Sequence, residues 1–210
     1  MNPERLQAQC FEFIAQTTPA DAAHDLSHIK RVVKTTLYLT DIEQANIEIT
    51  LPAACLHDCV SVSKASPLRS QASRLAADAA VEFLSGMNYP GALLPDIAHA
   101  IEAHSYSAAI PCRTLEARVV QDADRMDALG MIGMARCFVV GGKFNLPLFN
   151  PEDPFCENRE PDEKSWVIDH FYTKLFKLPD TMQTEAGRKE AHHRADLMRE
   201  FLESLRAEIL

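Results

Sequence analysis

Apolar side chains recur at helical spacing along almost the whole chain. In residues 4–17, Leu6, Cys10, Phe13 and Ile14 fall on one stripe, as one face of an amphipathic helix requires. No alternating run of convincing length indicates a β-strand. The same helical period predicts further helices over about residues 68–84, 96–104, 115–129, 162–178 and 184–205. The pattern therefore predicts an all-α protein.

Two more helices belong to this pattern. Asp25 can cap the first of them, which carries apolar residues at helical spacing over 29–37. Pro52 fits the first turn of the second, because a proline there removes no helical hydrogen bond. This second helix ends at the pair His57-Asp58.

The second half of the chain contains one long interruption. Residues 141–161 hold two Gly and four Pro with little periodicity, which predicts a long surface loop. Before it, residues 132–140 continue the helix of 115–129 past Gly130. Since no repeat and no change in composition divides the chain, we expect a single domain over residues 1–210. Its core would occupy about residues 20–140, with the helices of about 162–205 packed on it.

Composition narrows the function. The chain has 210 residues, of which 47% are hydrophobic and 24% are charged, as in ordinary soluble proteins. Its formal net charge of −9 repels phosphate backbones, so a nucleic-acid duplex is not an expected partner. No stretch approaches the roughly 20 apolar residues that span a bilayer, and the N-terminus lacks the layout of a secretory signal. With six cysteines in no paired framework, we expect a cytoplasmic protein without a membrane partner; the oligomeric state stays open.

The pair His57-Asp58 closes an almost wholly apolar run, residues 51–56. An imidazole and a carboxylate at the end of a buried helix are unfavourable unless something pairs with them. A divalent cation would pair with both, because it binds neutral imidazole and ionised carboxylate together. The alternative is a partly exposed helix end whose His and Asp face water.

Two other predicted helices carry ionisable groups beside apolar stripes. His24 and His28 stand one turn apart, and His28 borders the apolar stripe of its helix. Residues 117–127 place several acids, among them Asp122 and Asp124, inside an otherwise core-like helix. One His, the His-Asp pair and one of these acids would supply two imidazoles and two carboxylates.

That mixed nitrogen and oxygen set suits Mn²⁺, Mg²⁺, Fe²⁺, Ni²⁺ or Zn²⁺ and leaves coordination positions for water and substrate. Water bound to such an ion has a lowered pKa, and the ion can polarise a phosphoryl oxygen. The residues therefore predict a metal-dependent phosphohydrolase, whose metal the sequence does not identify.

The same residues carry a resemblance to a known family. His28, His57-Asp58 and Asp124 are similar to the H…HD…D signature of the HD-domain phosphohydrolases, which have an all-helical metal-binding core. Three segments resemble the bacterial YedJ/YpgQ-type HD hydrolases: AHDLSHIKRV at 23–32, VVQDADR at 119–125 and HFYTKL at 170–175. The resemblance extends over nearly the full chain and implies a helical bundle of the HD-domain type.

Carried over position by position, the resemblance implies His28, His57, Asp58 and Asp124 as metal ligands. Asp122 lies about 200° from Asp124 around a helix, so both cannot face one ion without distortion. The superfamily's Ala-Asp-(Arg/Lys) context matches Asp124 and its neighbours. Asp122 would then cap a helix or hydrogen-bond a ligand.

Asp58, His24 and Asp25 are the candidate catalytic residues. His24 and Asp25 would hydrogen-bond a ligating imidazole, and simple capping of the helix is the alternative for both. His99 and His104 are available as the two further histidines that binuclear diesterases of the superfamily use. Their five-residue spacing is awkward for one helix face.

Basic side chains could bind the phosphates of a substrate. Lys64 and Arg69 follow the His-Asp helix closely, while Lys174 and Lys177 lie three apart on the predicted helix of 162–178. The alternative for all four is a solvated basic face.

The expected partner is a small phosphorylated molecule, most plausibly a nucleotide. Within the resembled family, release of pyrophosphate from (deoxy)nucleoside triphosphates is an implied activity. A nucleoside monophosphatase, a phosphodiesterase or a non-catalytic nucleotide-sensing module are the alternatives. The sequence does not distinguish the nucleotide, the metal, or one metal from two.

Overall fold

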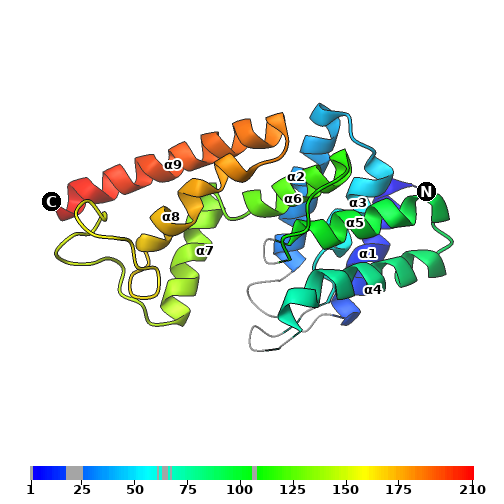
Figure 1. Ribbon diagram of the computed structural model, residues 1–210, viewed down its shortest axis with the longest axis horizontal. Coiled ribbons are helices and arrows are strands. Elements are labelled where there is room, and N and C mark those ends of the chain that lie inside the picture. The colour runs from blue at the N-terminus through cyan, green and yellow to red at the C-terminus, as the bar shows by residue number, and fades with distance from the viewer. Residues whose placement is uncertain (1, 18–25, 61, 63–65, 67, 106–107) are drawn as a thin grey trace. The chain divides into compact units, whose positions relative to one another are not determined.

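The computed structural model describes all residues except 1, 18–25, 61, 63–65, 67 and 106–107 (Figure 1). Within this part of the chain the structure is helical and contains no strand, which confirms the predicted all-α class. None of the described helices is long and apolar enough to cross a membrane. The α-helices are α1 Pro3–Thr17, α2 Leu26–Glu43, α3 Ile47–Leu56, α4 Ala72–Gly86, α5 Leu94–His104, α6 Leu115–Met126, α7 Gly130–Lys143, α8 Asp169–Thr173 and α9 Glu185–Ile209. The 3₁₀-helices are η1 Arg69–Gln71, η2 Gly91–Leu93, η3 Leu175–Lys177 and η4 Pro179–Thr181.

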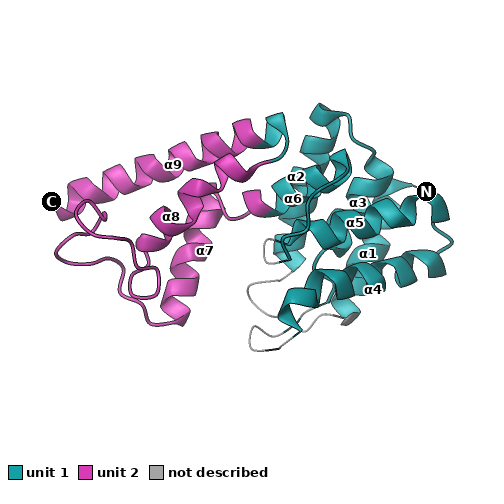
Figure 2. Cartoon of the chain, viewed as in Figure 1, with its two compact units in different colours: residues 1–124, 183–187 teal, residues 125–182, 188–210 magenta. Residues whose placement is uncertain are grey.

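The chain divides into two compact units, which Figure 2 shows in different colours. Unit 1 comprises residues 1–124 and 183–187, and unit 2 comprises residues 125–182 and 188–210. Helices α6 and α9 each contribute residues to both units. The single domain expected over the whole chain stays a prediction.

Helix α3 lies at the centre of unit 1 because its sequence is apolar on every side. Every residue from Ile49 to Leu56 is buried, as expected for a helix enclosed by others. It contacts α1, α2, α4 and α5. On α1 the predicted stripe is present, with Leu6, Cys10 and Ile14 buried. The C-terminal end of α3 therefore delivers the next residues into the interior of the unit.

Helix α3 begins earlier than the sequence suggested. Asn46 caps it, because the side-chain oxygen accepts a hydrogen bond from the Glu48 N–H at 2.9 Å. Pro52 consequently lies inside the helix, so its placement in the first turn was wrong. An interior proline removes the N–H that would bond the carbonyl four residues earlier, which here is that of Glu48.

Helices α6 and α7 are separate, although the sequence predicted one helix continuing past Gly130. A turn follows Met126, and Gly130 has a φ of +68°, a conformation that glycine adopts without steric strain. Arg136 of α7 reaches back to the Asp127 carboxylate with Nη1 at 2.5 Å. The turn is thus fixed by backbone geometry at one end and by an ion pair at the other.

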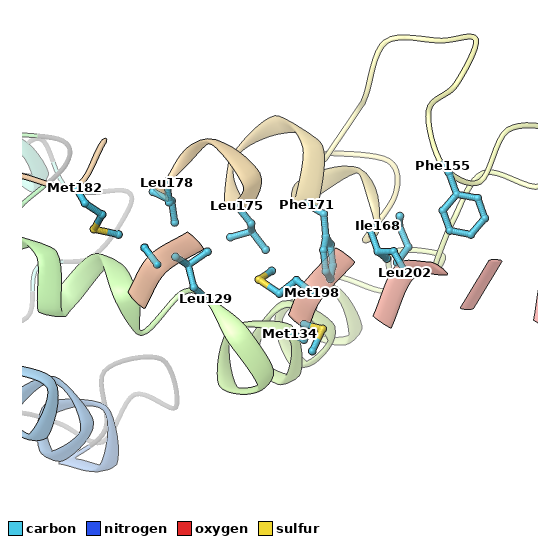
Figure 3. Packing of buried hydrophobic residues seen from close by; sticks show 11 residues of the cluster. Leu129, Met134, Phe155, Ile168, Phe171, Leu175, Leu178, Met182, Met198 and Leu202 are labelled. Carbon is cyan, nitrogen blue, oxygen red and sulfur yellow. The ribbon is translucent and has the colours of Figure 1, made fainter. Parts of the chain in front are cut away.

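Unit 2 is built around one cluster of buried apolar side chains (Figure 3). Phe171 of α8 is fully buried, and its ring centroid lies 6.2 Å from that of Phe138 and 6.0 Å from that of Phe176. The cluster consists of Leu129, Met134, Phe155, Ile168, Phe171, Leu175, Leu178, Met182, Ala191, Met198 and Leu202. Helices α7, α8 and α9 all contribute to it.

The single helix predicted over residues 162–178 was wrong. Only five residues form α8, and Lys174, with a φ of −133°, separates α8 from η3. The fully buried carboxylate of Asp169 accepts a hydrogen bond from Arg159 Nη2 at 2.8 Å and one from the Asp162 N–H at 2.6 Å. The chain before α8 is thus folded onto the first residue of that helix instead of extending it.

Candidate metal centre

Four ionisable side chains from three segments of unit 1 converge. His28 comes from α2, His57 and Asp58 follow the last turn of α3, and Asp124 comes from α6. The two imidazole Nε2 atoms of His28 and His57 lie 3.4 Å apart. Asp58 Oδ2 lies 4.0 Å from the former and 3.8 Å from the latter. The corresponding distances from Asp124 Oδ1 are 3.5 Å and 3.7 Å.

This donor set fits a divalent cation. Ligand atoms of His28, His57 and Asp58 lie within 4.8 Å of one another. Adjacent ligands of an ion with bonds of about 2.1 Å are roughly 3 to 3.5 Å apart, so small movements would bring these atoms to one ion. Both imidazoles are buried, whereas the Asp58 and Asp124 side chains are 25% and 26% exposed. Solvent therefore reaches the two carboxylates but not the two imidazoles.

His57 is held in the tautomer that a metal requires. Its Nδ1 donates a hydrogen bond to the Ala54 carbonyl at 2.8 Å, which leaves Nε2 as the atom with a free lone pair. Burial lowers the pKa of His57 below its ordinary value, although the charges of Asp58 and Asp124 act in the opposite direction. The imidazole is therefore neutral near pH 7.

Asp124 is ionised. Loss of solvent around its carboxyl group raises the pKa, but a hydrogen bond with His28 and the charges of His57 and His104 outweigh this effect. The pKa of Asp124 consequently lies well below its ordinary value. A neutral imidazole beside an ionised carboxylate is the protonation state in which these residues bind cations.

His104, at the end of α5, is a fifth member of the cluster; the sequence had offered it only together with His99, as the two histidines of a second metal site. Its Nε2 lies 3.6 Å from Asp58 Oδ1, and its Nδ1 donates to the Ile101 carbonyl at 2.6 Å. Burial would lower the pKa of His104, but the hydrogen bond to Asp58 and the charges of Asp124 and Asp58 raise it overall. The usable signal in the sequence was a histidine at the end of an apolar helix, the same signal that singled out His57.

His99 and His104 do not act together. The His99 Nε2 atom accepts a hydrogen bond from the Arg113 N–H at 3.0 Å. Burial, and then the charge of Arg113, lower the pKa of His99. His99 thus fastens the segment that leads into α6, whereas His104 faces the acids.

Asp122 and Asp124 face different parts of unit 1. The fully buried carboxylate of Asp122 accepts hydrogen bonds from the Gln183 N–H and from both the N–H and the hydroxyl of Thr184, each at 2.8 Å. These contacts cap the start of α9. A Cβ added at Gly187 would lie only 2.5 Å from Asp122 Oδ2, so this approach needs glycine. The role left to Asp122 by the sequence, that of a capping group, agrees with these contacts.

The remaining candidates are distributed more widely. His24, Asp25 and Lys64 lie outside the described residues. Arg69 Nη1 donates to the Val62 carbonyl at 3.0 Å, so its guanidinium is engaged by a backbone carbonyl. Exposed Lys174 and Lys177 belong to unit 2, the former between α8 and η3 and the latter in η3. They do not share one helix, because the predicted helix is broken at Lys174.

The sequence of the part of the chain that carries this cluster matches a known family. Residues 25–129 match the family model described as HD domain. The chain belongs to the HD-domain family. The matched range contains the four converging residues and His104, and the HD-domain family is metal-dependent.

Relatives extend the family match over nearly the full length. The protein YpgQ of Bacillus subtilis is 30% identical over 192 residues, which cover 91% of this chain and 87% of YpgQ. An HD-superfamily hydrolase from Bacillus thuringiensis is similar in structure, with a TM-score of 0.78, 29% identity and coverage of 99% and 98% of the two chains. The structure of Bacillus subtilis YpgQ in complex with ADP has a TM-score of 0.75, 26% identity and coverage of 100% and 97%. The HD-type fold implied by the sequence resemblance is confirmed.

Proposed function

We propose that this chain is a metal-dependent hydrolase of phosphate ester or anhydride bonds that acts on nucleotides. Release of pyrophosphate from (deoxy)nucleoside triphosphates is the specific activity we infer. The observation that carries the proposal is the convergence of His28, His57, Asp58 and Asp124. The two imidazole nitrogens lie 3.4 Å apart, and the distances between imidazole nitrogens and carboxylate oxygens are 3.5–4.0 Å. Two imidazoles and two carboxylates at one place are the donors that a divalent cation takes.

Those four residues would hold the ion. When bound, a divalent cation lowers the pKa of a coordinated water and polarises a phosphoryl oxygen. The buried rings of His28 and His57 anchor one side of the site, while the partly exposed Asp58 and Asp124 leave the other side accessible. Two carboxylates alone would repel a polyphosphate, so the donor set and an anionic substrate are compatible only with a cation between them.

Other residues would bind or orient the substrate. Asp58 is the candidate catalytic carboxylate, with His24 and Asp25 as further candidates. Lys64 and Arg69 would offset negative charge on phosphate oxygens, as basic groups do in phosphoryl transfer. The same role for Lys174 and Lys177 stays a prediction from the sequence. Because Arg69 already donates to a backbone carbonyl, we expect its contribution to be smaller than that of an uncommitted cation.

A nucleotide substrate is supported by the relative whose structure contains a nucleotide. YpgQ of Bacillus subtilis forms a complex with ADP. The structural match covers 97% of the YpgQ chain. The comparison therefore concerns the whole fold and not a shared fragment.

A nucleotide panel tests the proposal. We expect the full chain to hydrolyse at least one nucleoside triphosphate with Mn²⁺, Mg²⁺ or Ni²⁺ and to release pyrophosphate, identified by ³¹P nuclear magnetic resonance. Asp58→Ala and Asp124→Ala should abolish turnover, whereas Asp78→Ala should not, because Asp78 is an exposed aspartate on α4. Stepwise release of orthophosphate, or cleavage of cyclic or mono-nucleotides only, would replace pyrophosphate release with another phosphohydrolase activity. Metal-bound protein that binds nucleotides and cleaves none of them would overturn the enzyme proposal.

A further inference from the structure

The geometry points to His104 as a positioning residue of the proposed metal centre, which holds the Asp58 carboxylate through Oδ1 and leaves Oδ2 directed at the ligand imidazoles. This inference rests on the proposed function and adds a residue to that site. His104 is not one of the four residues assigned as ligands.

The two oxygens of Asp58 have different neighbours. Oδ2 lies 3.8 Å from His57 Nε2 and 4.0 Å from His28 Nε2. Oδ1 lies 3.6 Å from His104 Nε2. A carboxylate held at one oxygen has its second oxygen aimed in one direction, which is how residues behind a metal ligand orient it.

The ring of His104 is itself fixed. Its Nδ1 donates to the carbonyl of Ile101, three residues earlier, at 2.6 Å. His57 makes the same contact with Ala54, also three residues earlier. The His104 ring also packs edge-on against that of His57, with centroids 4.9 Å apart and planes at 83°. His57 and His104 each follow or end a helix, are each held by a hydrogen bond from Nδ1 to the carbonyl three residues earlier, and each place Nε2 near Asp58.

The position of His104 separates its role from that of His57. Its Nε2 lies beside Oδ1, whereas the imidazoles of His28 and His57 face Oδ2, the other oxygen of Asp58. The group of potential ligand atoms that lie within 4.8 Å of one another consists of His28, His57 and Asp58, without His104. With Nδ1 bonded to Ile101, Nε2 is the ring atom that contacts the carboxylate. This placement favours orientation of Asp58 over coordination.

His99 provides a matched control on the same helix. It is buried to almost the same extent, at 7% exposure, but its ring nitrogens contact Arg113: Nε2 accepts from the Arg113 N–H at 3.0 Å, and Nδ1 lies 3.3 Å from Arg113 Nη2. Substitution at His99 therefore tests whether loss of any buried histidine from α5 disturbs the metal centre.

The experiment measures the Mn²⁺ affinity of the full chain by electron paramagnetic resonance, in which the signal gives the concentration of free Mn²⁺. His104→Leu should weaken binding about tenfold or more, the usual effect of removing a partner that orients a metal ligand. His104→Gln should stay within about threefold of the wild type, because its amide N–H can still donate to Asp58 Oδ1. His99→Gln should not change the affinity. Far-UV circular dichroism and the unfolding midpoint of each variant confirm that the chain is folded.

Two results would overturn the inference. Wild-type affinity in folded His104→Leu would remove any role in positioning. An equal loss in His104→Gln and His104→Leu would make His104 a ligand instead of a donor to Asp58. Neither result depends on catalysis, so a wild-type protein that binds Mn²⁺ but hydrolyses no nucleotide would defeat the proposed function and leave the His104 measurement intact.

Discussion

The hydroxyl of Tyr89 donates a hydrogen bond to the carbonyl oxygen of Glu48 at 2.7 Å. That carbonyl is the one that Pro52, inside α3, leaves without its helical N–H partner. Tyr89, which follows α4, thus supplies the hydrogen-bond donor that the proline removes from the central helix of unit 1. The helix can keep a proline in its interior and still place His57 in the candidate metal centre.

We predict that Tyr89→Phe lowers the free energy of unfolding by about 1 kcal/mol, the typical effect of losing a hydrogen bond to a poorly solvated group. The effect should shrink when Pro52→Ala is also present, because alanine restores the N–H that bonds Glu48. A double-mutant cycle by urea unfolding measures this coupling. Equal Tyr89→Phe effects in both backgrounds would show that the hydroxyl does not replace the missing helical bond.

The same tyrosine makes a prediction about alkaline pH. Burial, with the nearby Glu48, raises the pKa of Tyr89 from 10.0 to about 12. Between these values the unfolded chain has lost the proton and the folded chain has kept it, so folding stability falls as the pH rises above 10. Wild type should lose about 1 kcal/mol more than Tyr89→Phe between pH 9 and pH 11. Urea unfolding at both pH values checks this, and parallel losses in the two proteins would contradict it.

We expect substitution of Asp122 to lower folding stability and substitution of Asp124 to weaken metal binding. Asp122→Ala removes the acceptor of three hydrogen bonds at the start of α9, and we expect a loss of about 2 kcal/mol in unfolding free energy. Asp124→Ala should instead remove the increase in unfolding midpoint that Mn²⁺ produces in the wild type. Thermal unfolding with and without Mn²⁺ gives both quantities. The reverse assignment of the two effects would mean that Asp122 is the ligand.

The ion pair of Arg159 and Asp169 should be a strong determinant of unit 2 stability. Asp169 is fully buried, and Arg159 contacts both of its carboxylate oxygens. Arg159→Met leaves a buried carboxylate without its cation, which typically costs about 3 kcal/mol. Adding Asp169→Asn to this variant should recover part of the loss, because the charge is removed. Denaturant unfolding of the single and double variants measures the recovery, and its absence would assign the loss to packing of the arginine stem.

Most of the helices could be predicted because their apolar spacing is a local property. Three candidate ligands could be predicted for the same reason, since His57 and Asp58 end an apolar run and His28 borders an apolar stripe. The choice of Asp124 over Asp122 came from the family resemblance. The positions at which the predicted helices are interrupted could not be predicted from this spacing. Asp169 begins α8 and accepts hydrogen bonds from Arg159 and from the Asp162 N–H, which folds the preceding chain onto it where a helix was predicted. Periodicity carries no information about such partners.

His104 shows the same limit at the site. In sequence it stands five residues from His99, and the two look equivalent. Only the fold separates them, because one meets Arg113 and the other meets Asp58. Likewise, the Asn46 cap that moved the start of α3 is a single side-chain contact, which the position of Pro52 alone did not reveal.

The two aspartates of α6 also restrict how this segment can change in length. Asp122 is committed to the start of α9, and Asp124 to the imidazoles of α2 and α3. One residue inserted between them would turn one aspartate about 100° relative to the other, so the chain would lose either the cap or the ligand. Substitutions can be absorbed along much of this helix, but insertions and deletions at residues 122–124 cannot.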